Sequence, residues 1–206
     1  MVRYSKAASV IAFFLIGAVG TVDLSAQNPS QLDNLKEPRI VTRKDERMLV
    51  VEATGDPNVV GGKAFSHLFQ LYYAMKETPK GPGQGVPRAR WPESLDHPKS
   101  EWTGYYALPV PETVTELPIQ EAPAGLRVLL TTWKYGEVAE LLHAGPYDKE
   151  EPTFERLKSF IKSRGYETVG GHEEEYIKGP TMSGKGDPEA YLTIIRYRVQ
   201  RAHKTQ

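Results

Sequence analysis

The chain has 206 residues, with 26 Lys and Arg residues against 26 Asp and Glu residues, so its formal net charge is zero at pH 7. That length allows one domain of ordinary size, or two small modules, with a real hydrophobic core. A balanced charge lacks the basic surface that holds a phosphate backbone, so no nucleic-acid partner is expected. The sequence contains no Cys, which excludes disulfides, Fe–S clusters, thiolate zinc sites and a Cys nucleophile.

Residues 1–26 have the pattern of a signal peptide. Two basic residues precede an apolar run from Ala7 to Val19, and Leu24-Ser25-Ala26 supplies the small residues that a signal peptidase reads. The run is too short to span a bilayer, which takes about 20 residues, but it suits a signal-peptide core. We expect cleavage after Ala26 and an exported protein, periplasmic or secreted. An uncleaved N-terminal anchor is the alternative, and without it no stable membrane anchor is expected.

Residues 27–38 are polar and lack periodicity, which predicts a disordered linker. One domain is expected over residues 39–200, built of modules at about 39–117 and 124–200. Residues 201–206 form a polar tail.

The first module is expected to contain strands around one helix. Met48–Ala53 is a β-rich run, and Thr54–Pro57 breaks it. Apolar residues at i, i+3, i+4 and i+7 spacings predict a helix from about Gly62 to Lys76. After the Pro- and Gly-rich residues 79–87, Trp102–Val110 predicts a closing strand.

The second module repeats this order at nearly the same spacing, after a joint at Pro118–Pro123. Alternating strands in both halves predict an α+β fold of two tandem βαββ modules. They form an antiparallel sheet with helices on one face and a ligand groove on the other. The elements expected in the second module are strands over 126–133, 135–143, 172–177 and 191–199 and a helix over 151–163.

Three segments of the second module carry a family resemblance. Glu137–Asp148 (EVAELLHAGPYD) resembles the strand-to-helix signature of the GyrI-like small-molecule-binding family. Glu174–Pro180 resembles its Glu-x-Tyr-Leu-x-x-Pro strand, and Leu192–Val199 resembles its closing strand. The family includes the effector-binding domains of multidrug-sensing transcription activators, built as two βαββ modules with a central groove.

The resemblance implies a stand-alone exported effector-binding domain. No pattern of DNA-binding helices precedes it, so the regulator role is not implied. Arg196 and Arg198 stand where the closing strand of the family more often has Glu-x-Ile-Pro character.

The run Glu173-Glu174-Glu175 contains the main candidate for a binding residue. Alternate residues of a strand share a face, so His172, Glu174 and Tyr176 point one way and the two flanking glutamates point the other. The resemblance aligns Glu174 with a groove carboxylate that meets cationic lipophilic ligands. An aromatic-lined, partly dry groove would strengthen that attraction. The residues alone, without the resemblance, favour a solvated edge that discourages aggregation.

Aromatic residues supply the rest of the predicted groove. Tyr176 shares the face of Glu174, Tyr147 follows a Gly-Pro turn, and Trp102 and Tyr106 share one face of their strand. Core packing for Tyr176 and a hydrophobic staple for Tyr147 are the alternatives. The predicted ligand-binding residues are Glu174, Tyr176, Tyr147, Trp102 and Tyr106.

These residues favour an exported protein that binds or sequesters an amphipathic, cationic small molecule. The first alternative is a hydrolase, because some GyrI-like proteins open the strained rings of cyclopropanoid natural products. There Glu174 would activate water, and Tyr176 or Tyr147 would hold the leaving oxygen.

The second alternative is haem binding, because the haem-associated SOUL proteins share the duplicated fold. The available imidazoles are those of His67, His97, His143, His172 and His203. No cofactor and no metal are expected, since no third ligand accompanies His172 and Glu174 at a diagnostic spacing. His143, at a strand end, is expected to be a hydrogen-bonded structural residue.

Overall fold

The computed structural model describes residues 32–91, 97–180 and 186–202. The predicted signal peptide, residues 27–31 of the predicted linker and residues 203–206 of the tail lie outside these ranges. Within these ranges, no helix is long and apolar enough to cross a membrane.

The described residues form an α+β fold with an eight-stranded antiparallel sheet and two α-helices, which confirms the predicted class. Short 3₁₀ turns occur in the connections. In chain order the main elements are β1 (Arg39–Arg43), β2 (Glu46–Thr54), α2 (Pro57–Ala74), β3 (Arg88–Trp91), β4 (Thr103–Pro109), β5 (Leu126–Trp133), β6 (Gly136–Ala144), α3 (Glu151–Ser163), β7 (Tyr166–Lys178) and β8 (Leu192–Arg201).

The strand order, β1-β6-β8-β7-β3-β4-β2-β5, contains the predicted duplication. The units β2-α2-β3-β4 and β6-α3-β7-β8 repeat the βαββ order, and β7 pairs with β3 where they meet. The strand that precedes each unit pairs with the other unit: β1 joins β6, and β5 joins β2. Each module therefore completes the sheet of its partner.

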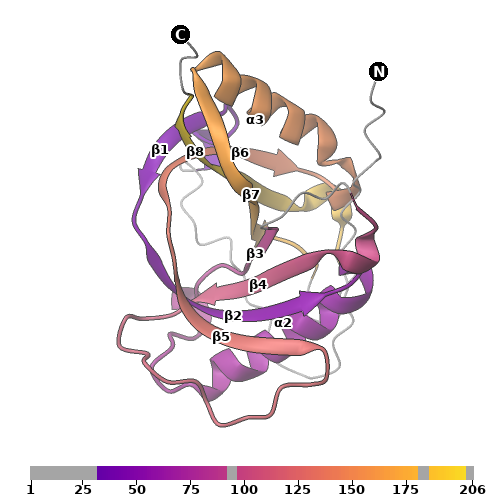
Figure 1. Ribbon diagram of the computed structural model, residues 1–206. Coiled ribbons are helices and arrows are strands. Elements are labelled where there is room, and N and C mark those ends of the chain that lie inside the picture. Colours follow the sequence, from indigo (N-terminus) through magenta and orange to yellow (C-terminus); the bar gives the residue numbers. More distant parts are fainter. Residues whose placement is uncertain (1–31, 92–96, 181–185, 203–206) are drawn as a thin grey trace.

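Short connections force this sheet to curl. Lys44 and Asp45 alone link β1, at one edge, to β2, which lies next to the opposite edge. Lys134 and Tyr135 link β5 to β6 in the same way. A residue spans at most about 3.6 Å, so the two ends of the sheet must approach each other. Figure 1 shows these strands arching between the half that carries α2 and the half that carries α3.

Both helices pack on the same face of the sheet. Phe65, Leu68 and Tyr72 of α2 lie in the largest hydrophobic cluster with residues of β2, β3 and β4. Leu157 and Ile161 of α3 pack on β6 and β8. The opposite face carries a separate cluster, including Met48, Val50, Trp133 and Val138, to which neither helix contributes. We call it the helix-free face.

The helix α2 begins five residues before the predicted start. The Asp56 side chain accepts a hydrogen bond from the Asn58 backbone N–H at 2.9 Å, and Pro57 occupies the first turn. Both are ordinary helix-start signals, and the segment had been interpreted as a break. The apolar periodicity starts later because Val59, in the first turn, is exposed.

Two strands and a buried segment were not predicted. β1 and β3 are short, and their polar residues hide the alternation that marks a strand. The prediction of a disordered linker is wrong for residues 32–38. The Leu35 side chain is buried against Val86, Ile177 and Ile194, and its carbonyl accepts a hydrogen bond from the Leu142 N–H at 2.8 Å.

Candidate functional site

The three consecutive glutamates of β7 are all buried, so they do not form a solvated edge. As predicted, Glu174 points away from Glu173 and Glu175. Glu174 lies on the helix-covered face, because its neighbour on that face, Tyr176, packs against Phe65 of α2. The sequence had placed the groove on the opposite face. Period-two alternation identifies residues that share a face, but it does not tell on which face the helices pack.

The Glu174 carboxylate, 1% exposed, is held by two side chains of its own strand. Tyr176 Oη donates to its Oε2 at 2.7 Å, and His172 Nε2 lies 3.0 Å from its Oε1. Among the ion pairs of the described residues, neither Lys nor Arg contacts this carboxylate. The imidazole is its only partner in the described residues that can carry a positive charge, so a buried negative charge here lacks a permanent counter-charge.

Aromatic rings enclose this carboxylate. The Tyr176 ring lies 5.7 Å from that of Tyr147 and 5.8 Å from that of Phe65, both in edge-to-face contact. Tyr106 packs against Phe65 at 5.0 Å. Trp102 lies one layer further out, where its Nε1 donates to the His97 carbonyl at 2.9 Å. Four of the five predicted residues therefore lie together, namely Glu174, Tyr176, Tyr147 and Tyr106. The fifth, Trp102, is one layer further from the Glu174 carboxylate.

Several polar atoms near Glu174 have no hydrogen-bond partner among the described residues. They are Tyr106 Oη, Tyr147 Oη, Thr193 Oγ1 and both carboxyl oxygens of Glu150, and the Thr193 hydroxyl is near enough to the Glu150 carboxyl to lower its pKa in part. The charge of Glu174 raises the pKa of both tyrosines further, after burial has raised it, which places all these groups around one centre. Buried polar groups are nearly always satisfied, so these groups require water or a ligand as their hydrogen-bond partner.

Glu150 is the residue of this site that the sequence analysis missed. It is buried directly before α3, and burial followed by the nearby charge of Glu174 raises its pKa to about 10. Its carboxyl group is therefore neutral at pH 7. In the sequence it lies in the charged run Asp148–Glu151, which is typical of an exposed helix start. Its position three residues after Tyr147, on the same side of a helical turn, was the available signal.

His143 is hydrogen-bonded, as predicted. Its Nδ1 lies 2.9 Å from Thr153 Oγ1 and its Nε2 lies 3.1 Å from the Pro146 carbonyl. Burial lowers its pKa, which favours the neutral imidazole. Within the described ranges, no group of three or more His, Asp or Glu side chains is arranged to hold a metal ion.

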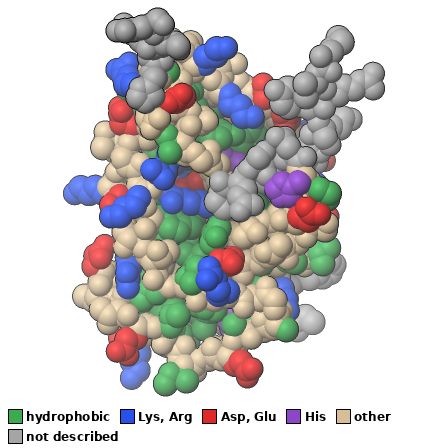
Figure 2. Space-filling model, viewed as in Figure 1, with side chains coloured by type: hydrophobic (Ala, Val, Ile, Leu, Met, Phe, Trp, Pro, Cys, Tyr) green, Lys and Arg blue, Asp and Glu red, His purple; other side chains and the backbone are tan. Residues whose placement is uncertain are grey.

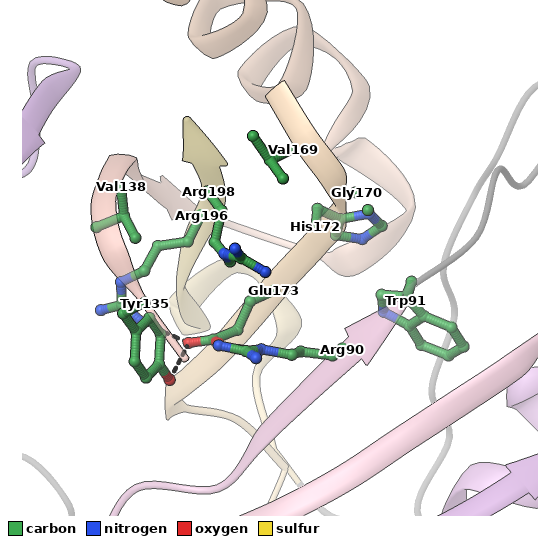
Figure 3. Close-up of a pocket in the computed structure, with 11 residues that line it drawn as sticks. Arg90, Trp91, Tyr135, Val138, Val169, Gly170, His172, Glu173, Arg196 and Arg198 are labelled. Atoms are coloured by element: carbon green, nitrogen blue, oxygen red, sulfur yellow. Dashed lines mark hydrogen bonds and ion pairs between the residues drawn. The ribbon is translucent and has the colours of Figure 1, made fainter. Parts of the chain in front are cut away.

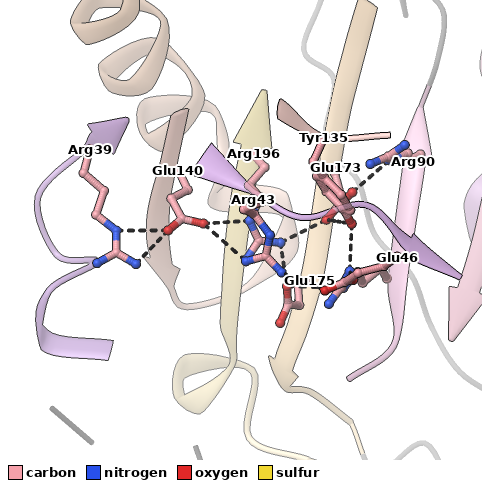
Figure 4. Close-up of polar contacts among 10 residues, drawn as sticks. Arg39, Arg43, Glu46, Arg90, Tyr135, Glu140, Glu173, Glu175 and Arg196 are labelled. Atoms are coloured by element: carbon pink, nitrogen blue, oxygen red, sulfur yellow. Dashed lines mark hydrogen bonds and ion pairs between the residues drawn. The ribbon is translucent and has the colours of Figure 1, made fainter. Parts of the chain in front are cut away.

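The helix-free face carries a row of alternating charges directly opposite the Glu174 site. Arg39, Glu140, Arg196, Glu173 and Arg90 are cross-strand neighbours on β1, β6, β8, β7 and β3. Consecutive members are joined by ion pairs of 2.7, 2.7, 2.9 and 2.8 Å (Figure 4). The row connects both modules across the sheet.

A second layer of polar contacts supports this row. Arg88 pairs with Glu46 and with Glu175, and its Nη1 donates to Tyr135 Oη at 2.7 Å. Tyr135 Oη in turn donates to Glu173 at 3.1 Å. The nearby arginines hold the pKa of Glu175 at about 2, although its burial alone would raise it. Figure 2 shows basic, acidic and hydrophobic side chains gathered in the middle of the view.

Comparison with known proteins identifies the fold. No protein-family model and no curated protein matches the sequence. Among solved structures, an uncharacterized conserved protein from Listeria innocua has a TM-score of 0.65 at 22% identity, covering 80% of this chain and 93% of that one. A hydrolase from Listeria innocua has a TM-score of 0.62 at 20% identity, covering 80% and 92%. The C-terminal domain of EcmrR has a TM-score of 0.57 at 14% identity, covering 81% and 98%.

These similarities extend over nearly the whole of each related chain, and they support the GyrI-like fold that the resemblance implied. At these identities they describe the fold alone.

Proposed function

We propose that this protein binds an amphipathic, cationic small molecule at Glu174, between α2 and α3. The observation that carries the proposal is a buried carboxylate without a Lys or Arg partner, enclosed by aromatic rings. An isolated buried charge is strongly unfavourable in a low-dielectric interior. A bound cation would supply the missing counter-charge, and the ring faces would contribute cation–π attraction.

The unsatisfied oxygens define where the ligand would sit. Tyr106 Oη, Tyr147 Oη and the neutral Glu150 carboxyl would donate to acceptors on the ligand or to water that accompanies it. Because the Glu174 side chain is buried, the surrounding rings must move before a ligand reaches it. The association rate constant should therefore be lower than that of a site that is open before the ligand arrives.

The predicted signal peptide makes export part of the proposal. The binding module would then act outside the cytoplasm, where capture of a lipophilic cation would sequester it.

A matched pair of ligands and a matched pair of variants test the proposal. Methyltriphenylphosphonium and triphenylphosphine oxide have nearly the same shape and differ by one charge. We expect calorimetry to show saturable binding of the cation that weakens at least about tenfold in Glu174→Gln, the scale of a lost buried charge interaction. Glu150→Gln replaces a neutral carboxyl in the same site, so it should change the cation affinity by less than about threefold.

Equal affinities for the cation and the oxide would contradict a charge-selective site. An unchanged cation affinity in Glu174→Gln would show that Glu174 does not bind the cation.

The pair Glu150 and Glu174 favours a second candidate function, hydrolysis of a strained-ring substrate. Two neighbouring carboxyl groups of which one stays protonated are the usual arrangement of a general acid and a general base. Glu174 would activate water, and Tyr147, whose Oη has no partner among the described residues, would hold the leaving oxygen. Turnover of a cyclopropanoid substrate that is lost in Glu174→Ala and in Glu150→Gln would support it. Ligand binding without turnover would contradict the hydrolase function and support the binding function.

A further inference from the structure

A cavity lies on the helix-free face, where the pairing register of β7 and β8 is interrupted. Their ladder holds at Thr168 and resumes at His172, so the β7 residues between them face the single residue Arg198 on β8. Gly170 adopts a φ of 76° within this bulge, a conformation that favours glycine. Bulges are frequent beside functional sites because they break the ladder and redirect side chains. Here the bulge opens onto a cavity of about 150 Å³.

The cavity combines cationic and aromatic walls. Figure 3 shows the Arg90 side chain and Glu173 extending toward Tyr135, and the Trp91 ring lying on the other side of β3 from them. The Arg90 guanidinium stacks over Trp133 at 4.0 Å and Tyr135 at 4.6 Å, so it is held in place. The lining residues used in the argument are Arg90, Arg196, Arg198, Tyr135, Val138 and His172.

Arg198 differs from every arginine of the row. Arg196, its neighbour on the same face of β8, is buried and pairs with Glu140, Glu173 and Glu175. Arg198 is exposed, and it makes neither an ion pair nor a hydrogen bond with any residue in the described ranges. Asp45 is close enough for Arg198 to lower its pKa slightly, but Asp45 is already held by Lys134 and by the Tyr135 N–H.

The charges around the cavity do not balance. Four carboxylates, those of Glu46, Glu140, Glu173 and Glu175, serve five arginines in the ion pairs of this face. Arg198 adds a further positive charge. Asp45 and Lys134 cancel each other. Glu167, which accepts from Gln200 on this face, offsets part of the excess. The face still has more arginines than carboxylates next to a partly enclosed volume, and a bound anion would neutralise the difference.

We infer that this cavity binds a small planar carboxylate, about the size of benzoate. A cavity of about 150 Å³ matches one aromatic ring, as the known capture of benzene by engineered cavities of that size illustrates. The Arg198 guanidinium presents a planar fork that fits a carboxylate with two parallel hydrogen bonds. Tyr135 would pack against the ring of the ligand, whereas the Trp91 ring is buried on the opposite face with Tyr106 and Trp102. His172 lines this cavity and also contacts Glu174, so the two sites are neighbours through the sheet, but the Glu174 carboxylate is not part of the lining and the inference does not require the cation proposed there.

Calorimetric titration of the full chain with sodium benzoate tests the inference, and benzamide serves as the neutral analogue of the same shape. We expect saturable benzoate binding that weakens at least about tenfold in Arg198→Gln, because charge-assisted hydrogen bonds have that magnitude. Arg127→Gln is the matched control, since it removes an exposed guanidinium at the far edge of the same face. It should leave the benzoate affinity within about twofold.

Three results would overturn the inference: no saturation by benzoate, equal benzoate affinity in Arg198→Gln and the unaltered chain, or equal affinity for benzamide. Tighter binding of inorganic phosphate than of benzoate would also contradict a planar carboxylate. Glu174→Gln should leave benzoate binding unchanged, so a failure of one site is distinguishable from a failure of the other.

Discussion

Glu174 and Glu150 occupy one buried site in different environments. The Glu174 carboxylate accepts from Tyr176 and contacts His172, whereas the Glu150 oxygens have no partner among the described residues. Burial and the charge of Glu174 together keep Glu150 protonated at pH 7, so its neutral state depends on its neighbour. The site therefore presents one charge and one proton donor to a ligand.

This difference predicts how stability depends on pH. The folded state holds the Glu150 proton up to a pKa of about 10, whereas the unfolded chain loses it near its ordinary value of 4.5. Between these values the folded state binds more protons, so the free energy of unfolding falls as pH rises through this window. Glu150→Gln removes this contribution. We expect urea unfolding to show the variant more stable than the parent at pH 9 by at least about 1 kcal/mol, with a smaller difference at pH 5.

The matched control for this prediction is Glu155→Gln, which changes an exposed carboxyl group on α3. Its free energy of unfolding should equal that of the parent at both pH 5 and pH 9. Parallel pH profiles for the parent and Glu150→Gln would show that Glu150 does not carry the proton assigned to it.

At the scale of elements, the charge row across five strands couples the two modules. Arg196 is 2% exposed and contacts three carboxylates, so its removal would leave Glu140, Glu173 and Glu175 without a shared cation. Breaking a buried ion pair from one side is far more harmful than replacing all its members. The row is thus a point of structural vulnerability beside the proposed carboxylate site.

We predict that Arg196→Met lowers the free energy of unfolding by about 3–5 kcal/mol. Arg127→Met, which breaks the exposed pair with Glu52, should lower it by less than about 1 kcal/mol. Denaturant unfolding at pH 7 measures both. Equal effects of the two substitutions would mean that the buried row is no more important for stability than a surface pair.

The alternation of strands, the α3 helix and the grouping of the glutamates were predictable because each is a local pattern. β1 was not, since its half-buried residues depend on pairing with β6, far along the chain. The face of Glu174 was not predictable either, because it depends on where the helices pack. Glu150 was missed for the same reason, since apart from its spacing of three residues from Tyr147 it resembles the solvated Asp148.

At the scale of the whole molecule, exchange of the opening strands makes the two modules one folding unit. β1 completes the half that contains α3, and β5 completes the half that contains α2. Buried residues of both modules, such as Phe65 and Tyr147, share one hydrophobic cluster. Neither half can bury its edge or its share of the Glu174 site without the other.

We therefore predict a single unfolding transition for residues 27–206. Far-ultraviolet circular dichroism, which follows both modules, and fluorescence of Trp91, Trp102 and Trp133 should give coincident midpoints. Separate midpoints would indicate modules that unfold independently, contrary to the exchanged topology.

The central claim is that the enclosed carboxylate of Glu174 selects a cation, and one titration tests it most directly. Trp91 lies 6.4 Å from His172, which contacts Glu174, so its fluorescence should report occupancy of the site. Titration with methyltriphenylphosphonium should change this fluorescence saturably, and triphenylphosphine oxide should not do so at the same concentrations. The same response to both compounds, or no response to either, would contradict the claim.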